Sequence, residues 1–484
     1  MEQLLASYIP GSPDKNCMAF RYKIIFYYPA LDKENKGTEF LYSPLSLAYL
    51  SAQTPDHFQK ELYDEYVGED IDPYSVKADI VAMSPLTSGV NRAYRVADIL
   101  RERGITCVIG GAHASAMPGE AREHFDAVIM GEGEGPWKEF LRDFENNSIR
   151  ESYFGRMDVE LDQLGVPDRN MVHPNYHYPS INTSRGCPYG CSFCYLTVYK
   201  NRRYRAIPHE TVLEDMESLR GETLLVVTDE NFIGYSRQDH EDRKSLLRKM
   251  IQRNFGFYWG CQASLNIAED PELMDLMYES GCRSVFIGFE SANPSDLKEI
   301  RKNHNANIDY KQIVETIHSH KLTVIASCIL GLDNHHKDYH KQLIRDLKQM
   351  KVDYVRVFLM TSWPGTPLNK SLKKEGRLIE NWDRTRKDIP NIHYKNYSHQ
   401  EILSARKEVI DSFFNFSHVL RTILRWLFID RSLMKLFIKM AIRNRISEQI
   451  RNKRALKFIL KESYVGGEKT QKTARTVASA GTGS

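Results

Sequence analysis

The chain has 484 residues, of which 42% are hydrophobic, and its formal net charge at pH 7 is +3. This length suggests two or three domains, and the near-neutral charge gives no whole-chain signal for nucleic-acid binding. The eight cysteines do not indicate a disulfide framework. Three of them are grouped in one loop, and a chain of this length does not need disulfides to stabilise its fold. No basic region followed by an apolar run opens the sequence, so we expect no signal peptide and a reduced, cytoplasmic location.

The first third of the chain alternates short apolar runs with helical patterns. The apolar runs, each typical of a buried strand, are residues 23–28, 78–84, 106–111 and 126–130. Segments 43–54 and 94–103 have the pattern of helices. This alternation predicts an α/β fold with a doubly wound parallel sheet.

Small and polar residues follow three of these predicted strands, at the edge where ligands of such sheets bind. Small residues let a large flat ligand approach the backbone, although ordinary tight turns also favour glycine. The candidate ligand-binding residues are Ser84, Thr87, Ser88, Gly110, Gly111, His113, Ser115, Gly131, Glu132 and Gly133.

One loop in the middle of the chain, residues 184–195, holds three cysteines close together. Cys187, Cys191 and Cys194 form the pattern C-x-x-x-C-x-x-C, with glycine and proline between them that let the backbone curl. Iron–sulfur clusters are held by cysteine thiolates, usually four of them. Three thiolates would therefore leave one iron of a cluster open.

A zinc site and a plain apolar core are the alternatives for these cysteines. His173 and His177 precede the loop with the spacing H-x-x-x-H, which zinc sites can use. Pro174 disfavours a continuous helix through that pair, and the histidines precede the cysteines instead of following them. Unrelated buried cysteines remain the simpler alternative.

Residues 181–365 again alternate strands and helices. The predicted strands after the cysteine loop are residues 224–229, 257–264, 284–291, 324–333 and 354–360, with helices such as 271–281 and 310–320 between them. Parallel strands with outer helices suggest a partial or full (β/α) barrel. The cysteine loop follows the first strand, so it would lie at the C-terminal mouth, where such barrels place their active sites.

The chain ends in a predicted helical region. Apolar residues recur there at helical spacing beside arginines and lysines, namely Leu420, Ile423, Leu424 and Leu427, then Leu433, Leu436, Phe437 and Met440. Such basic amphipathic helices can cap the barrel or lie in a membrane interface. No uncharged span reaches the roughly 18 residues of a transmembrane helix.

These patterns predict five segments along the chain. They are a doubly wound domain at 1–145, a linker at 146–180, a barrel at 181–380, a helical region at 381–465 and a polar, disordered tail at 466–484.

The cysteine loop resembles the signature of the radical S-adenosylmethionine (SAM) superfamily. The cysteine spacing and the aromatic Phe193 before the last cysteine carry this resemblance. It implies that Cys187, Cys191 and Cys194 are the metal ligands of a 4Fe-4S cluster. In that superfamily SAM chelates the open iron, and an electron from the cluster cleaves SAM to give a 5′-deoxyadenosyl radical.

The same resemblance assigns polar residues at later strand ends to SAM. They are Asp229, Glu230 and Asn231 for the amino group, Gln262 and Ser264 for the ribose or carboxylate, Glu290 for a further contact and Gly331 for the adenine. Each alone also fits a helix N-cap or a plain strand-end polar group, but their order after the cysteines favours the SAM role.

Residues 20–145 resemble the cobalamin-binding domain that precedes many radical SAM domains, which implies that the small and polar strand-end residues contact cobalamin. The Asp-x-His-x-x-Gly motif that supplies an axial histidine in other cobalamin proteins is absent, because the expected loop reads Asp64-Glu65-Tyr66-Val67-Gly68. Many radical SAM members lack that histidine and still bind cobalamin, and some relatives keep the fold without cobalamin. His113 is a candidate substitute.

The resemblance as a whole is to cobalamin-dependent radical SAM enzymes, many of which methylate unactivated carbon. It implies SAM as methyl donor and radical source, and an electron donor such as flavodoxin or ferredoxin. The basic, apolar C-terminus suggests an apolar small-molecule substrate such as a lipid, hopanoid or porphyrin-like molecule, with a hydrophobic natural product or a peptide as alternatives. A cyclase or oxidase acting on a tetrapyrrole-like or lipid substrate is one alternative. A non-catalytic cobalamin and cluster sensor is another. Peripheral membrane contact is expected from the basic C-terminal helices, and no side chain is assigned as catalytic.

Overall fold

The structure is a computed structural model that describes residues 20–31, 43–157, 161–199, 202–429 and 455. The predicted tail at 466–484 and the second amphipathic run, with Leu433, Leu436, Phe437 and Met440, lie outside the described residues.

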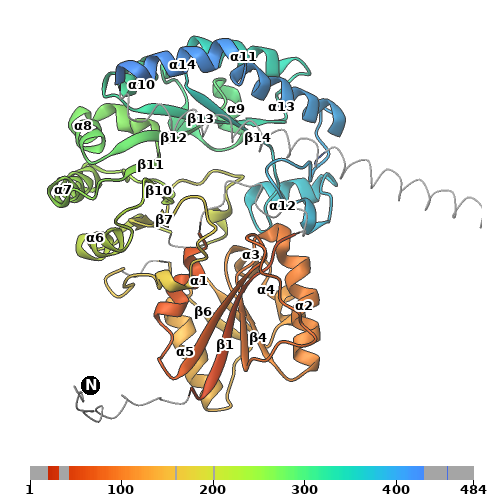
Figure 1. Ribbon diagram of the computed structural model, residues 1–484. Helices are drawn as coiled ribbons and strands as arrows, with labels where there is room; N and C mark the ends of the chain where they lie inside the picture. Colours follow the sequence, from red (N-terminus) through yellow and green to blue (C-terminus); the bar gives the residue numbers. More distant parts are fainter. Residues whose placement is uncertain (1–19, 32–42, 158–160, 200–201, 430–454, 456–484) are drawn as a thin grey trace, which may run out of the picture.

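The N-terminal domain is built on a six-stranded parallel sheet, which confirms the predicted doubly wound fold (Figure 1). Its strand order is β2-β1-β3-β4-β5-β6. The strands are β1 (Tyr22–Tyr28), β2 (Phe58–Asp64), β3 (Ile80–Met83), β4 (Thr106–Ile109), β5 (Ala127–Met130) and β6 (Ser152–Phe154). The helices are α1 (Leu45–Ala52), α2 (Val90–Glu102), α3 (Ala112–Ala116), α4 (Pro118–His124) and α5 (Glu134–Glu145).

Both faces of this sheet are covered by helices. In β1, Ile25 and Tyr27 pack with the core under α2, α3 and α4, whereas Ile24 and Phe26 pack with the core under α1 and α5. Successive strand residues point to opposite faces, so a strand buried on both sides is apolar throughout. This explains why the inner strands could be found from their apolar runs.

The two strands that the sequence pattern missed, β2 and β6, are the edges of the sheet. In β2 all five residues between Phe58 and Asp64 are only half-buried, so Lys60 and Glu61 are tolerated there. β6 lies within the segment predicted as a linker and pairs in parallel with β5.

The second domain is an open, six-stranded parallel sheet in the order β14-β13-β12-β11-β10-β7, which makes it a partial barrel. Its strands are β7 (Ser180–Ile181), β10 (Leu224–Val227), β11 (Tyr258–Ala263), β12 (Cys282–Glu290), β13 (Thr323–Leu330) and β14 (Tyr354–Leu359). The outer helices are α6 (His209–Ser218), α7 (Arg237–Arg253), α8 (Pro271–Glu279), α9 (Pro294–Glu299), α10 (Tyr310–Ser319) and α11 (Tyr339–Gln349).

Three helices follow the barrel: α12 (Pro367–Lys374), α13 (His399–Phe413) and α14 (Phe416–Ile429). α12 lies between the barrel and the N-terminal domain (Figure 1). α13 covers the edge strand β14, where the buried Arg406 donates from Nε to the Val357 carbonyl at 2.9 Å. The amphipathic run predicted as a helical cap or membrane-surface helix is α14, which contacts the barrel where His418 Nε2 lies 2.8 Å from the Asp353 carbonyl oxygen. None of the helices in the described ranges is both long and apolar enough to cross a membrane.

A buried carboxyl at the end of β2 makes the stability of the N-terminal domain depend on pH. Asp64 is fully buried, accepts from the Tyr66 amide at 2.9 Å and from the Tyr176 hydroxyl, and has His173 and Glu69 nearby. Burial raises the pKa of Asp64 from 3.8 to about 6. Because the folded state binds this proton more tightly, about 3 kcal/mol of stability is present below pH 4 and lost as the pH rises through 6.

We therefore expect Asp64→Asn, which keeps an acceptor without the charge, to raise the thermal midpoint more at pH 8 than at pH 5. Differential scanning fluorimetry at the two pH values measures this. Asp56→Asn, at an exposed aspartate, is the control and should show no such difference. An equal shift of the Asp64→Asn midpoint at both pH values would contradict the assignment.

Candidate functional site

The cysteine loop is held at its base by a short antiparallel hairpin. β8 (Ser184–Arg185) pairs with β9 (Arg205–Ala206). Gly186, between β8 and the first cysteine, has φ of +93°, and a Cβ there would lie 2.1 Å from the Arg203 carbonyl oxygen. Only glycine fits this backbone and this contact.

Contacts from the barrel fix the rest of the loop. The Tyr189 ring stacks on His304 with ring centroids 3.7 Å apart. The Ser192 amide donates to the Ile300 carbonyl at 2.9 Å, and the Leu368 amide of α12 donates to the Ser192 carbonyl at 3.0 Å. The loop is thus positioned from both sides before any metal binds.

Cys191 is buried, and Cys187 and Cys194 of the same loop are half-buried. The pKa of Cys191 is raised to about 11 and that of Cys194 to about 12, mainly by burial and in part by the charge of Cys187. Thiolates bind metal in their deprotonated form, so the positive charge of iron would offset the cost of ionising this group. The donor set therefore fits an iron–sulfur cluster that takes three protein ligands.

The zinc alternative is not supported by the geometry. His173 Nε2 lies 3.2 Å from Glu69 Oε1, in the N-terminal domain. Within the described ranges, no three His, Cys, Asp or Glu side chains converge as a single metal ion requires.

Asp229, Glu230 and Asn231 follow β10, and only Glu230 lines the cavity described below. Buried Asp229 accepts from the Thr183 amide at 2.8 Å and from two hydroxyls, Thr183 Oγ1 at 2.5 Å and Ser184 Oγ at 2.7 Å. Asn231 is buried and bonds to the Gly234 carbonyl at 2.7 Å. Glu230 accepts from the Gly186 amide at 3.1 Å.

Gln262 and Ser264, at the end of β11, lie beside this segment. The exposed Gln262 donates to the Asp229 carbonyl at 3.1 Å, and the Ser264 amide donates to Asn231 Oδ1 at 3.0 Å. The end of β11 and the segment after β10 therefore form one hydrogen-bonded unit, next to the cysteine loop.

Glu290 ends β12 in a strained backbone, with φ of +61°. Its carboxylate pairs with Lys302 Nζ at 2.7 Å. Both charges act on Cys191, since Glu290 raises its pKa and Lys302 lowers it. Sequence patterns missed Lys302, which follows α9 outside any motif, so only the fold reveals that it lies beside the cysteines.

Gly331, predicted to meet the adenine, has φ of +95°, and a Cβ there would lie 2.5 Å from the Tyr394 ring. Gly331 therefore packs beneath Tyr394.

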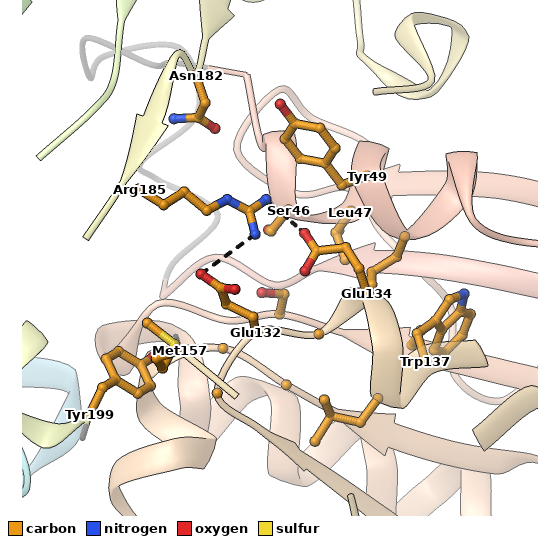
Figure 2. Close-up of a pocket in the computed structure, with 18 of the residues that line it drawn as sticks. Ser46, Leu47, Tyr49, Glu132, Glu134, Trp137, Met157, Asn182, Arg185 and Tyr199 are labelled. Carbon is orange, nitrogen blue, oxygen red and sulfur yellow. Dashed lines mark hydrogen bonds and ion pairs between the residues drawn. The ribbon is translucent and has the colours of Figure 1, made fainter. Parts of the chain in front are cut away.

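A cavity of about 290 Å³ lies where the N-terminal domain meets the cysteine loop (Figure 2). Six of the predicted strand-end residues line it, namely Ser84, Gly110, Gly111, Gly131, Glu132 and Gly133. The barrel side contributes Asn182, Arg185, Gly186, Tyr195, Leu196, Tyr199 and Glu230, and Tyr49 and Trp137 line it from α1 and α5. Residues from both domains thus share one cavity.

The remaining strand-end candidates do not line this cavity. Thr87 and Ser88 are buried in a 3₁₀ turn, Thr87–Gly89, that packs against the 3₁₀ turn Trp382–Arg384. Ser115 supports the cavity wall, because its hydroxyl donates to the Gly111 carbonyl at 2.8 Å and accepts from the Gly131 amide at 3.0 Å.

His113 does not line the cavity and lies in a buried cluster. Its Nε2 lies 3.1 Å from the Tyr94 hydroxyl and 3.6 Å from Glu120 Oε1. The centroids of the His113 and Trp382 rings lie 5.2 Å apart. Tyr66, which occupies the histidine position of the absent Asp-x-His-x-x-Gly motif, is buried against Tyr28.

An ion-pair network joins the N-terminal domain to the hairpin that carries the cysteine loop (Figure 2). Arg185 Nη2 lies 2.7 Å from Glu134 Oε1, and Arg185 Nη1 lies 3.9 Å from Glu132 Oε1. Arg205, whose side chain is 1% exposed, pairs with Glu132 at 2.5 Å. The glycine-rich turn after β5 is therefore tied directly to β8 and β9.

Breaking this network should loosen the contact between the domains. We expect Arg205→Met to lower the free energy of unfolding by about 3 kcal/mol, because it leaves Glu132 buried with only the more distant Arg185. Urea denaturation measures this. Arg150→Met, which removes the pairs that the exposed Arg150 forms with Glu139 and Asp143, is the control and should have little effect. Equal losses for both variants would contradict a structural role for the network.

Two family models match the chain. The model described as "Radical SAM superfamily" matches residues 181–347, and the model described as "B12 binding domain" matches residues 38–141. The two matches follow each other in the order of the two domains in the structure.

Curated proteins and solved structures are similar to most of the chain. The bacteriochlorophyllide d C-12(1)-methyltransferase of Chlorobaculum tepidum is 29% identical over 70% of this chain and 76% of its own length. The hopanoid C-2 methylase of Rhodopseudomonas palustris is 26% identical over 70% of this chain and 66% of its own length. The methyltransferase TsrM from Kitasatospora setae, solved with cobalamin and a [4Fe-4S] cluster bound, has a TM-score of 0.63 at 17% identity and covers 89% of this chain and 99% of its own.

Proposed function

Because this chain belongs to the radical SAM superfamily, among the members with a B12-binding domain ahead of the barrel, we propose that it methylates an unactivated carbon of an apolar small molecule. The observation that carries the proposal is the shared cavity. The strand ends of the N-terminal domain and the segment that holds the cysteines line one space, so groups bound to each would face each other.

The cofactors of this enzyme are a 4Fe-4S cluster, SAM and cobalamin. When bound, the cluster and SAM supply a radical and cobalamin supplies a methyl group, so the hard chemistry is that of the cofactors. In our proposal Cys187, Cys191 and Cys194 hold the cluster. The cavity-lining glycines allow cobalamin to approach the backbone, and Glu230 presents a carboxylate between the two.

The remaining SAM candidates have a different role in this proposal. Asp229 and Asn231 use their side chains within the protein, so they position the loop. Glu290, held by Lys302, supplies fixed charge beside the cluster. In this proposal the side chains bind and position the cofactors, and none is assigned as a proton donor or acceptor.

The side chains at the mouth of the barrel support the proposed substrate class. The Tyr195 side chain, next to the last cysteine, is 41% exposed, and Phe358 near the end of β14 is half-buried. Aromatic rings that remain at least partly accessible favour a flat, apolar partner. The substrates named for the two curated relatives, a bacteriochlorophyllide and a hopanoid, are both polycyclic and largely apolar, so we propose a polycyclic substrate.

A membrane surface and a protein electron donor complete the proposal. Leu420 and Leu424, one helical turn apart on α14, are 42% and 47% exposed. A helix with such a face can rest in a membrane interface, from which an apolar substrate could be drawn. The electron that starts each SAM cleavage comes from a separate donor such as flavodoxin or ferredoxin.

The test is anaerobic reconstitution with iron, sulfide and cobalamin, followed by incubation with reductant and SAM carrying a deuterated methyl group. We expect 5′-deoxyadenosine and bound corrinoid. With a polycyclic substrate, we also expect a methylated product that carries three deuterium atoms in each added methyl group. A product without deuterium but two hydrogens lighter would instead indicate the cyclase or oxidase alternative. Failure to form deoxyadenosine with an intact cluster would contradict catalysis and favour a sensor.

A further inference from the structure

Lys387 lies at the mouth of the barrel, outside the sites described so far. Its carbonyl accepts from the amide of Leu359, the last residue of β14, at 2.9 Å. In β14, Val355, Val357 and Leu359 pack in the core under the outer helices, so Phe358 faces the interior of the barrel. The Lys387 ammonium lies 4.6 Å from the centroid of the Phe358 ring, which places this charge over the interior.

The nearby acidic groups already have partners. Glu290 and Cys194 are the negative groups that act on Lys387. Glu290 pairs with Lys302 at 2.7 Å, and Cys194 belongs to the cluster loop. The adjacent Asp388 pairs with Arg386 at 3.2 Å.

The Lys387 ammonium therefore stands without an anionic partner. Within the described part of the chain it forms no ion pair, because Glu290 and Cys194 act on it through their charge alone, and it contacts the Phe358 ring. It is exposed, yet surrounding protein lowers its pKa, because desolvation disfavours the charged form. An ammonium held in such surroundings costs free energy unless an anion binds to it. An unpaired ammonium beside an aromatic ring favours an apolar ligand that carries one anionic group.

We propose that Lys387 binds a carboxylate of the substrate and that the substrate is therefore a polycyclic acid. This inference rests on the proposed function and narrows its substrate class. The carboxylate bound to Lys387 would fix one end of the substrate, while the Phe358 ring beneath the ammonium contacts the apolar body. One charge-assisted contact at a fixed distance from the cluster would select which carbon faces the reacting groups.

The test compares acids with their own methyl esters, so that only the anionic charge changes. The probes are a chlorin with one free propionate and a polycyclic terpenoid carboxylic acid, each with its methyl ester, and binding to the reconstituted protein is measured by fluorescence or calorimetry. We expect at least one acid to bind about tenfold or more tightly than its ester, the scale of one charge-assisted hydrogen bond. If neither acid is preferred, the proposal is wrong.

Variants assign the preference to this residue. Lys387→Met should remove the acid preference and leave ester binding unchanged, whereas Lys387→Arg should retain part of it. Lys373→Met, at an exposed lysine on α12, should behave as the unmodified protein. SAM affinity, the electron paramagnetic resonance spectrum of the cluster and deoxyadenosine formation should be unchanged in Lys387→Met.

The same variants separate this inference from its alternatives. Weakened SAM binding with an unchanged acid preference would mean that Lys387 serves the SAM carboxylate, and an altered cluster spectrum alone would mean that it balances the cluster charge. Both outcomes would overturn the proposal. Loss of acid preference in a protein that still forms deoxyadenosine and holds corrinoid would leave the proposed function intact, since those readouts do not involve Lys387.

Discussion

Cys191→Ala is expected to abolish SAM cleavage and to reduce the iron and sulfide that the reconstituted protein retains. Cys191 is the middle of the three loop cysteines and is 8% exposed. Its neighbour Ser192 is fixed by backbone hydrogen bonds to Ile300 and Leu368, so the loop cannot shift to supply another ligand. With two thiolates left, a cluster that needs three protein ligands should not persist.

Cys328→Ala is the matched control for this variant. Cys328 is equally a buried cysteine of the second domain, but it packs with Val324 and Ala326 in the core under the outer helices. It should retain iron, sulfide and deoxyadenosine formation. If Cys191→Ala also retained all three at the level of the unmodified protein, the assignment of the cluster would be wrong. Corrinoid binding should survive in both variants, because the strand ends of the N-terminal domain are untouched.

The sequence predicts the inner strands well and the edge strands poorly, for a physical reason. β1, β3, β4 and β5 are covered on both faces, which requires continuous apolar runs. β2 and β6 lie at the two edges, where half-exposed positions accept charged residues. The edge strand β7 of the second sheet has only two residues, although both are buried. The doubly wound domain and the barrel followed from the inner strands alone.

In the candidate site, the features that are local in sequence could be predicted, and the contacts between distant residues could not. The cysteine loop is local in sequence, so its spacing was sufficient to find it. The network of Arg185 and Arg205 with Glu132 and Glu134 joins residues more than 50 positions apart, and nothing in the local sequence marks the partners. The direction of a side chain is equally hidden, as Asp229 shows, since its place after a strand predicts a ligand contact while its carboxylate bonds to Thr183 and Ser184.

Gly110→Leu is expected to block cobalamin binding while leaving the cluster chemistry in place. Gly110 lies just after β4 and lines the shared cavity. A Cβ at this position would lie 3.6 Å from the Ile129 carbonyl oxygen, an ordinary contact, and its backbone is outside the left-handed region. Leucine can therefore be accepted without backbone strain, and its side chain would fill space that the ligand needs. We expect bound corrinoid, measured by its visible absorption, to fall about tenfold or more, with methyl transfer lost.

Gly119→Leu provides the same substitution outside the cavity, because Gly119 is exposed on α4 and a Cβ there meets nothing within 4 Å. It should keep corrinoid and activity. In Gly110→Leu, deoxyadenosine formation should continue, since the three cysteines do not line the cavity and Glu230 lines it from the barrel side. Such an uncoupled variant would show that the cavity wall of the N-terminal domain controls methyl delivery alone. Full corrinoid content in Gly110→Leu would instead mean that cobalamin binds elsewhere, and the shared cavity could no longer carry the proposed function.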